Sequence, residues 1–102
     1  MWKRKFYEGK FQHFYEEVGI ACFKDESGWK FRFINSVECN KGEFNAYVES
    51  VFFWKSLTAV KKYVENTLHS GGQFSMIAKN VNCRTMVDGY KFIDGKFRPQ
   101  AY

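Results

Sequence analysis

Five side chains of this 102-residue chain could bind a metal ion or act as nucleophiles and bases, namely His13, Cys22, Cys39, His69 and Cys83. None of them stands at C-x-x-C or H-x-x-x-H spacing, the arrangements that bring two ligands of a structural zinc together. The sequence therefore predicts no metal site. Three widely spaced cysteines do not make a disulfide framework, so we expect reduced thiols and a cytoplasmic protein, with a Cys22–Cys39 bridge as the open alternative.

The glycine pair Gly71-Gly72 is the nearest approach to a phosphate-binding loop, but it follows a predicted helix instead of preceding one. Phosphates bind at the positive N-terminal end of a helix, so this pair is better interpreted as a helix stop. No acid–base pair or nucleophile with a neighbouring base can be identified. We therefore expect a non-enzymatic protein that uses no cofactor.

Aromatic and basic residues dominate the composition, with 21 aromatic side chains, a formal net charge of +5 and a pI near 9.2. The charge divides by region: residues 1–10 balance at +3, residues 11–54 at −3 and residues 55–102 at +5. Cations interleaved with rings suit either phosphate attraction with base stacking or a protein-interface hot spot. The predicted partner-binding residues at the two ends are Trp2, Lys3, Arg4, Lys5, Arg84, Tyr90, Lys91, Lys96, Phe97 and Arg98. If the two ends meet in space, they form one positive face.

The segment from Gly28 to Phe33 alternates aromatic and basic side chains, which invites comparison with the aromatic motif of RNA-recognition sheets. Alternation places Trp29, Phe31 and Phe33 on one face of a strand and the two cations on the other. The small residues that the motif needs between its rings are absent. We therefore expect the rings in the core and Lys30 and Arg32 on a solvated face.

Periodicity predicts an antiparallel meander of three strands followed by one helix. The strands cover 18–23, 29–34 and 44–54, with turns at 24–28 and 40–43. Ser56 is a candidate N-cap for a helix over Leu57–His69, whose apolar residues recur at Leu57, Val60, Val64 and Leu68.

A fourth strand is predicted over 74–78, and Asp88-Gly89 and Asp94-Gly95 predict hairpin turns between short strands near the C-terminal end. Pro99 is expected to end regular pairing. Residues 5–18 fit either a helix, because Tyr7, Phe11 and Phe14 follow helical spacing, or an irregular strand. The fold class predicted for residues 1–102 is a single α+β domain with an antiparallel sheet of about five strands and one main helix packed on one face.

The size of the chain and the order of its elements over residues 17–79 resemble those of small phage-encoded proteins that inactivate bacterial defence systems, the anti-CRISPR proteins among them. The resemblance implies a stoichiometric inhibitor that docks on a nucleic-acid-processing complex of the host. Many such inhibitors are acidic nucleic-acid mimics, whereas this chain is net basic, which puts simple mimicry in doubt. The acidic middle region could still provide a local negative patch.

Two binding interpretations therefore stay open, beside a third possibility, an enzyme with a dispersed site that would appear as a sizeable pocket lined by ionisable groups with perturbed pKa values. The first is a protein or ribonucleoprotein partner bound by a monomer or dimer away from any membrane, and the alternative is direct binding of RNA or single-stranded DNA through the basic, aromatic-rich ends. Salt separates them, because phosphate contacts weaken steeply as ionic strength rises.

Overall fold

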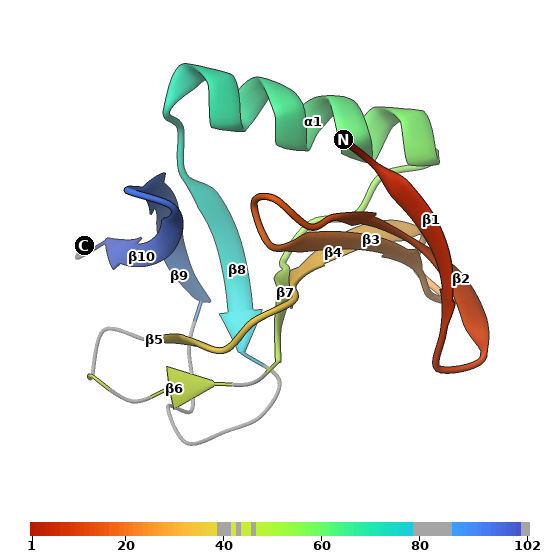
Figure 1. Cartoon of the computed structure of the whole chain (residues 1–102), viewed down its shortest axis with the longest axis horizontal. Coiled ribbons are helices and arrows are strands. Elements are labelled where there is room, and N and C mark those ends of the chain that lie inside the picture. Colours follow the sequence, from red (N-terminus) through yellow and green to blue (C-terminus); the bar gives the residue numbers. More distant parts are fainter. Residues whose placement is uncertain (39–41, 43, 46, 79–86, 101–102) are drawn as a thin grey trace.

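The computed structural model describes residues 1–38, 42, 44, 45, 47–78 and 87–100, and it shows one helix lying across one face of an antiparallel sheet (Figure 1). The elements in chain order are β1 (Lys3–Tyr7), β2 (Lys10–Tyr15), β3 (Ile20–Lys24), β4 (Trp29–Phe33), β5 (Val37–Glu38), β6 (Phe44–Asn45), β7 (Val48–Ser50), α1 (Leu57–Ser70), β8 (Phe74–Ala78), β9 (Val87–Ile93) and β10 (Lys96–Gln100).

The predicted α+β class is confirmed, but the main sheet has eight strands and not about five. Their order is β1-β2-β3-β4-β7-β8-β9-β10, while β5 and β6 pair separately as a two-stranded sheet. The extra strands come from hairpins at the two edges, which lie on opposite sides of the molecule in Figure 1. Their turns place Glu8-Gly9 at φ 51° and 82° and Asp94-Gly95 at φ 52° and 79°, the two positive values of a two-residue type I′ hairpin turn.

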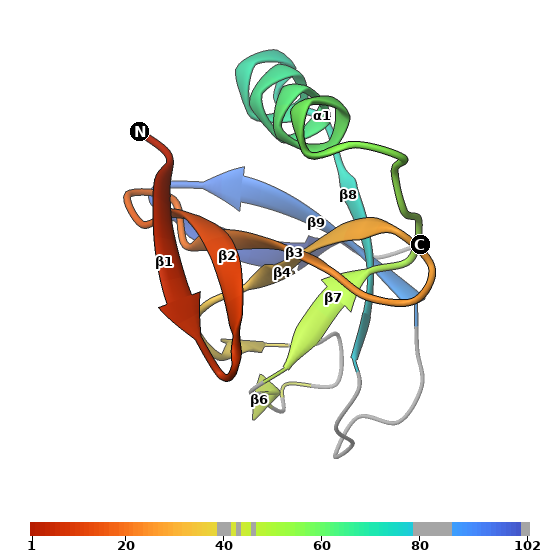
Figure 2. The ribbon, with the colours of Figure 1, turned by 90° about the vertical axis from the view of Figure 1, so that its right-hand side faces the viewer.

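Helix α1 begins and ends where its capping residues predict. The Ser56 hydroxyl accepts a hydrogen bond from the Ala59 amide at 3.1 Å, and Gly71 ends the helix in the left-handed conformation at φ 72°. Val60 and Val64 face the sheet and are fully buried. Figure 2 shows the helix almost end-on, with the sheet curling beneath it.

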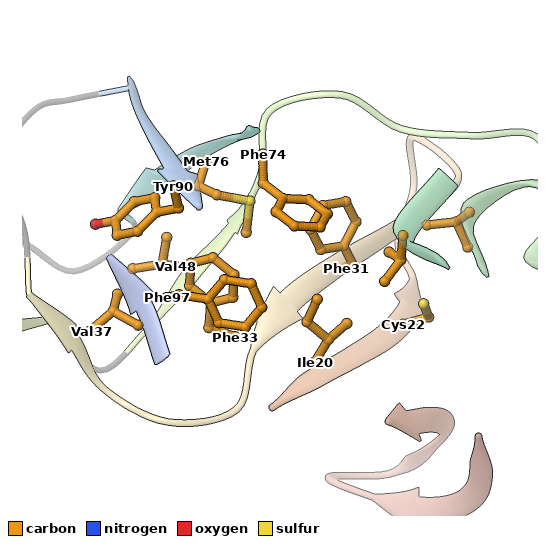
Figure 3. Packing of buried hydrophobic residues seen from close by; sticks show 12 residues of the cluster. Ile20, Cys22, Phe31, Phe33, Val37, Val48, Phe74, Met76, Tyr90 and Phe97 are labelled. Atoms are coloured by element: carbon orange, nitrogen blue, oxygen red, sulfur yellow. The ribbon is translucent and has the colours of Figure 1, made fainter. Parts of the chain in front are cut away.

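Aromatic rings from distant strands fill the core between the helix and the sheet (Figure 3). Phe31 and Phe33, the inward pair of β4, are 1% exposed, as alternation predicts, and Phe74 and Met76 of β8 are fully buried. Each buried phenylalanine contributes about 1.5–3 kcal/mol through the apolar surface that it removes from water. Much of the aromatic excess in the composition therefore stabilises the fold itself.

The predicted third strand over 44–54 is broken in the structure. After β7 the Ser50 hydroxyl accepts a hydrogen bond from the Phe31 amide at 3.2 Å and donates one to the Phe52 carbonyl at 2.9 Å. The Ser50 hydroxyl thus binds the Phe31 amide in place of a backbone carbonyl of the sheet. The chain then leaves the sheet until Trp54 pairs with Trp29 as an isolated bridge. Phe52, which lies just after the break, is 59% exposed as a result.

Two predictions near the C-terminal end are wrong. Asp88 and Gly89 form no turn, because β9 runs through them and pairs them with Met76 and Ser75 of β8. Pro99 does not end the pairing either, since it lies inside β10 opposite Tyr90. A proline is tolerated there because β10 is the last strand of the sheet order, where one side of the backbone needs no ladder partner.

Candidate interaction surfaces

The two basic ends of the chain lie at opposite edges of the sheet. Strand β1 carries Lys3, Arg4 and Lys5 at the first edge, and β10 carries Lys96 and Arg98 at the last edge. The single positive face considered from the sequence therefore does not form. Arg84 lies outside the described residues.

Two aromatic residues predicted as partner contacts belong to the core instead. Tyr90 is 2% exposed and its hydroxyl donates to the Glu38 carbonyl at 3.3 Å, while Phe97 is 9% exposed and stacks on Phe33. Along β9 and β10 the rings alternate with cations, so rings and cations lie on opposite faces of each strand. The face that packs against the core is the one that carries the rings. Lys91 is half-buried, and the Arg98 guanidinium donates to the Ile93 carbonyl at 3.4 Å.

The first residues of the chain are tied to acidic neighbours. The ammonium groups of Lys3 and Lys5 lie 4.0 and 2.5 Å from the carboxylate of Glu16. Hydrogen bonding from Lys5, together with its charge, lowers the pKa of Glu16. The Trp2 indole donates to the Glu65 carboxylate of α1 at 2.8 Å and contacts the Tyr15 ring edge-on, so Trp2 attaches this end to the helix. Two of the three β1 cations, Lys3 and Lys5, thus have an acidic partner within the described part of the chain.

The exposed rings of the β1–β2 hairpin are absent from the predicted site. Phe6 is 63% exposed and Phe11 47%, and their centroids lie 5.1 Å apart in an edge-to-face arrangement. The guanidinium carbon of Arg4 lies 3.7 Å from the centroid of the Phe11 ring. We call Arg4, Phe6 and Phe11 the hairpin patch. The feature of the sequence that could have indicated these rings is Gly9, which lies between two segments rich in aromatic and basic residues. A glycine in that position indicates a hairpin turn, and the hairpin would place Phe6 opposite Phe11.

The hairpin patch continues toward helix α1 through His13, the direct pairing partner of Arg4. The His13 ring contacts Trp29 edge-on at 6.2 Å. Burial, reinforced by the positive charges of Lys61 and Arg4, lowers the pKa of His13. Within the described ranges, Arg4, His13 and Lys61 enter no ion pair. Arg4 and Lys61 thus bring two positive charges without an ion-pair partner among the described residues to this corner of the surface, where the Glu65 carboxylate is hydrogen-bonded to the Trp2 indole.

A cavity of about 620 Å³ opens beside β10, between the β2–β3 turn and the segment that leads into β5. Phe33 and Phe97 contribute to its wall together with three of the charged residues, Lys96, Arg98 and Glu38. The cavity therefore brings together Lys96, Phe97 and Arg98, three of the partner-binding residues predicted near the C-terminal end. Both rings are almost fully buried, so they present little surface to a ligand.

The sheet face opposite the helix holds a buried polar network, so the prediction of a solvated face for Lys30 and Arg32 is wrong. Arg32 is 9% exposed and donates twice to the Gln12 side-chain oxygen, at 3.1 and 3.3 Å. Lys30 forms an ion pair with Glu49, which is 4% exposed. Arg32 also lies 5.6 Å from the Tyr7 ring, because the β1–β2 hairpin curls over this face. The network is accounted for by the architecture alone.

The ionisable groups offer no activated nucleophile in the part of the chain that the structure describes. Cys22 is fully buried with a free thiol, and burial raises its pKa to about 12, which disfavours the reactive thiolate. Cys39 and Cys83 lie outside that part, and so does the alternative of a Cys22–Cys39 bridge. No cluster of three or more His, Cys, Asp or Glu side chains able to hold a metal ion occurs among the described residues.

No protein-family model, curated protein or solved structure matches this chain. Among the described residues, α1 has neither the length nor the apolar composition of a membrane-crossing helix. The surfaces above are therefore interpreted from their own chemistry.

Proposed function

We propose that this chain is a non-enzymatic binding protein that docks stoichiometrically on a protein or ribonucleoprotein complex through the hairpin patch. The activity that the anti-CRISPR resemblance implies, inhibition of a host nucleic-acid-processing or defence complex in the cytoplasm, is part of this proposal. The single observation that carries the docking surface is the exposure of Phe6 and Phe11 beside a stacked arginine. Exposed phenylalanines on an edge hairpin add nothing to this core, whereas rings and arginines dominate protein-interface hot spots.

Three features favour a protein contact over a nucleic-acid backbone. The basic ends lie at opposite edges, so they do not line one track for a strand. Lys3 and Lys5 share Glu16, which reduces the charge available to phosphates. The Tyr90 and Phe97 rings, which would have stacked on bases, are buried.

The test is a tagged pull-down from cells of the organism that carries the gene, with each sample divided into nuclease-treated and untreated halves. The ring variant Phe6→Ser/Phe11→Ser removes the exposed apolar surface without touching the core. Phe52→Ser is the control, because Phe52 is similarly exposed at 59% but lies away from the hairpin, between β7 and α1. A defined complex that survives nuclease, persists in the control and disappears in the ring variant supports the proposal.

Loss of every partner on nuclease treatment would overturn the proposal in favour of RNA or single-stranded DNA binding. Equal capture by the ring variant and the wild type would instead remove the hairpin patch as the docking surface. Inhibition is then measured as the activity of the captured complex, titrated with the purified chain. An inhibitor stops turnover at one equivalent, and unchanged activity at a large excess would rule this part out.

A further inference from the structure

The arginine of the hairpin patch is held in a position that leaves its hydrogen-bonding edge available. Arg4 lies with its guanidinium carbon 3.7 Å from the Phe11 ring centroid, so one face of the group covers the ring. Within the described residues, the Arg4 side chain makes no hydrogen bond or ion pair. A guanidinium that is already positioned by a ring loses less side-chain entropy when its fork receives a planar oxyanion.

Two further side chains that can carry a positive charge, His13 and Lys61, lie close enough to Arg4 or to each other to interact electrostatically. His13 is the cross-strand partner of Arg4, and side chains of directly opposed residues lie about 5 Å apart at their Cβ atoms. Lys61 approaches from α1, with its ammonium 5.4 Å from the Trp2 ring centroid and close enough to oppose the charging of His13. One anion at this corner would therefore meet donors from β1, β2 and α1.

The number of available charges limits the ligand to a single anionic group. Lys3 and Lys5 flank Arg4 in sequence, so they project to the other face of β1, where Glu16 pairs with both. A nucleic-acid strand needs several phosphate contacts along its path. The isolated cluster suits one carboxylate of a protein, with Phe6 and Phe11 beside it for an apolar neighbour.

We propose that Arg4, His13 and Lys61 bind the carboxylate of an acidic residue on the partner, and that an apolar side chain next to that residue packs on Phe6 and Phe11. The recognised element is thus an exposed acidic and aromatic segment of a protein. This inference rests on the proposed function, because it specifies what the docking surface contacts.

Bound carboxylate should make protonation of His13 easier, so binding strengthens as the pH falls. The charged or titratable groups near His13 are Arg4 on β1, Cys22 on β3 and Lys61 on α1, with Glu65 one helical turn beyond Lys61. The two cations disfavour the imidazolium in the free protein, and Cys22 stays neutral because its pKa is near 12. An added anion offsets the cations and raises the pKa of His13.

The experiment is an NMR titration of the full chain with the peptide acetyl-Phe-Glu-Asp-Phe-amide, with acetyl-Phe-Gln-Asn-Phe-amide as the neutral counterpart. We expect saturable shifts of the His13 ring with the acidic peptide, tighter binding at about pH 6 than at about pH 8, and an increase in the pKa of His13. Arg4→Gln and Lys61→Gln should each weaken binding about tenfold, the size of one lost charge-assisted hydrogen bond. Lys62→Gln is the matched control on the exposed side of α1.

Equal binding of the two peptides, or unchanged binding in Arg4→Gln with an intact spectrum, would overturn the proposal. A decathymidylate strand that binds more tightly than the peptide, with a salt dependence indicating several phosphates, would overturn it in favour of a nucleic-acid site. Capture of the cellular complex separates the two proposals. If the ring variant loses the complex while Arg4→Gln and Lys61→Gln retain it, the hairpin patch remains the docking surface and the carboxylate site is wrong. If neither the wild type nor any variant captures a complex, the proposed function is wrong.

Discussion

Phe33 of β4 and Phe97 of β10 stack with their centroids 4.2 Å apart and their planes at 19°, although their strands are not neighbours in the sheet. Figure 3 shows the two rings side by side within the buried cluster. The contact forms because the curled sheet returns its last strand over the core. The C-terminal hairpin is thus a structural element and not an appendage that presents rings to a partner.

Replacement of Phe97 by alanine should destabilise the protein by about 3–4 kcal/mol, since it removes a ring that packs on Phe33, Phe74 and Phe92. Urea unfolding followed by tryptophan fluorescence measures this change. Phe52→Ala, at an exposed ring, should change stability by less than about 0.5 kcal/mol. If the two variants unfold at the same urea concentration, Phe97 is not part of the core.

The Lys30–Glu49 ion pair should respond differently to single and double replacement. Among the described residues, Glu49→Leu leaves the Lys30 ammonium with the more distant Asp25 carboxylate at 3.8 Å, and it should cost about 3 kcal/mol. The double variant Lys30→Met/Glu49→Leu should recover part of that loss, because an apolar pair can replace a buried ion pair, whereas the Tyr47 hydroxyl still loses its hydrogen bond to Glu49. Additive losses in chemical denaturation would show that the two side chains do not act as a pair.

Gly28 should tolerate no side chain. It has φ +143°, and a Cβ atom there would stand 2.8 Å from the Trp54 carbonyl oxygen, a backbone atom that is itself paired with Trp29. Gly28→Ala should therefore lower the thermal midpoint far more than Gly9→Ala, where the backbone is strained at φ +82° but no atom lies within 4 Å. A smaller loss at Gly28 than at Gly9, measured by calorimetry, would contradict the clash.

His13 should make stability fall at mildly acidic pH. Its pKa in the folded chain is lowered by burial and then by Lys61 and Arg4, so the unfolded chain takes up a proton first. The contribution of neutral His13 is complete above the unfolded pKa of about 6.5 and is lost as the pH falls through the lower folded pKa. Urea midpoints measured between about pH 5 and 8 should show this slope in the wild type and a reduced slope in His13→Gln. Identical slopes in the wild type and in His13→Gln would show that a group other than His13 causes the pH dependence.

Local signals predicted the elements whose residues have unambiguous roles. Helix α1 was predicted almost to the residue because Ser56 and Gly71 have specific capping geometries. The strict alternation of aromatic and basic residues in β4 predicted that Phe31 and Phe33 face the core. The alternatives for residues 5–18 could not be decided, because Tyr7, Phe11 and Phe14 fit a helical period although they lie on a hairpin. Its first strand is exposed throughout, and its second is buried at Gln12 and Phe14.

The candidate site was harder to predict because it depends on how distant strands meet. The burial of Arg32 follows from Gln12 and Tyr7 closing over it, a contact that exists only once the first hairpin curls across the sheet. Tyr90 and Phe97 share their strands with cations, so either face could have been the inner one until β9 and β10 joined the main sheet. Composition indicated a ring-and-cation surface but not which rings were exposed.

The closure of the core by β10 sets a condition on how the chain is made. On the ribosome, Phe33 is synthesised long before Phe97, and until the later ring emerges the inner faces of β4 and β8 have no cover at that end. This core therefore cannot close until β10 has been synthesised, and the growing polypeptide must keep several large rings from premature association until the β9–β10 hairpin is available.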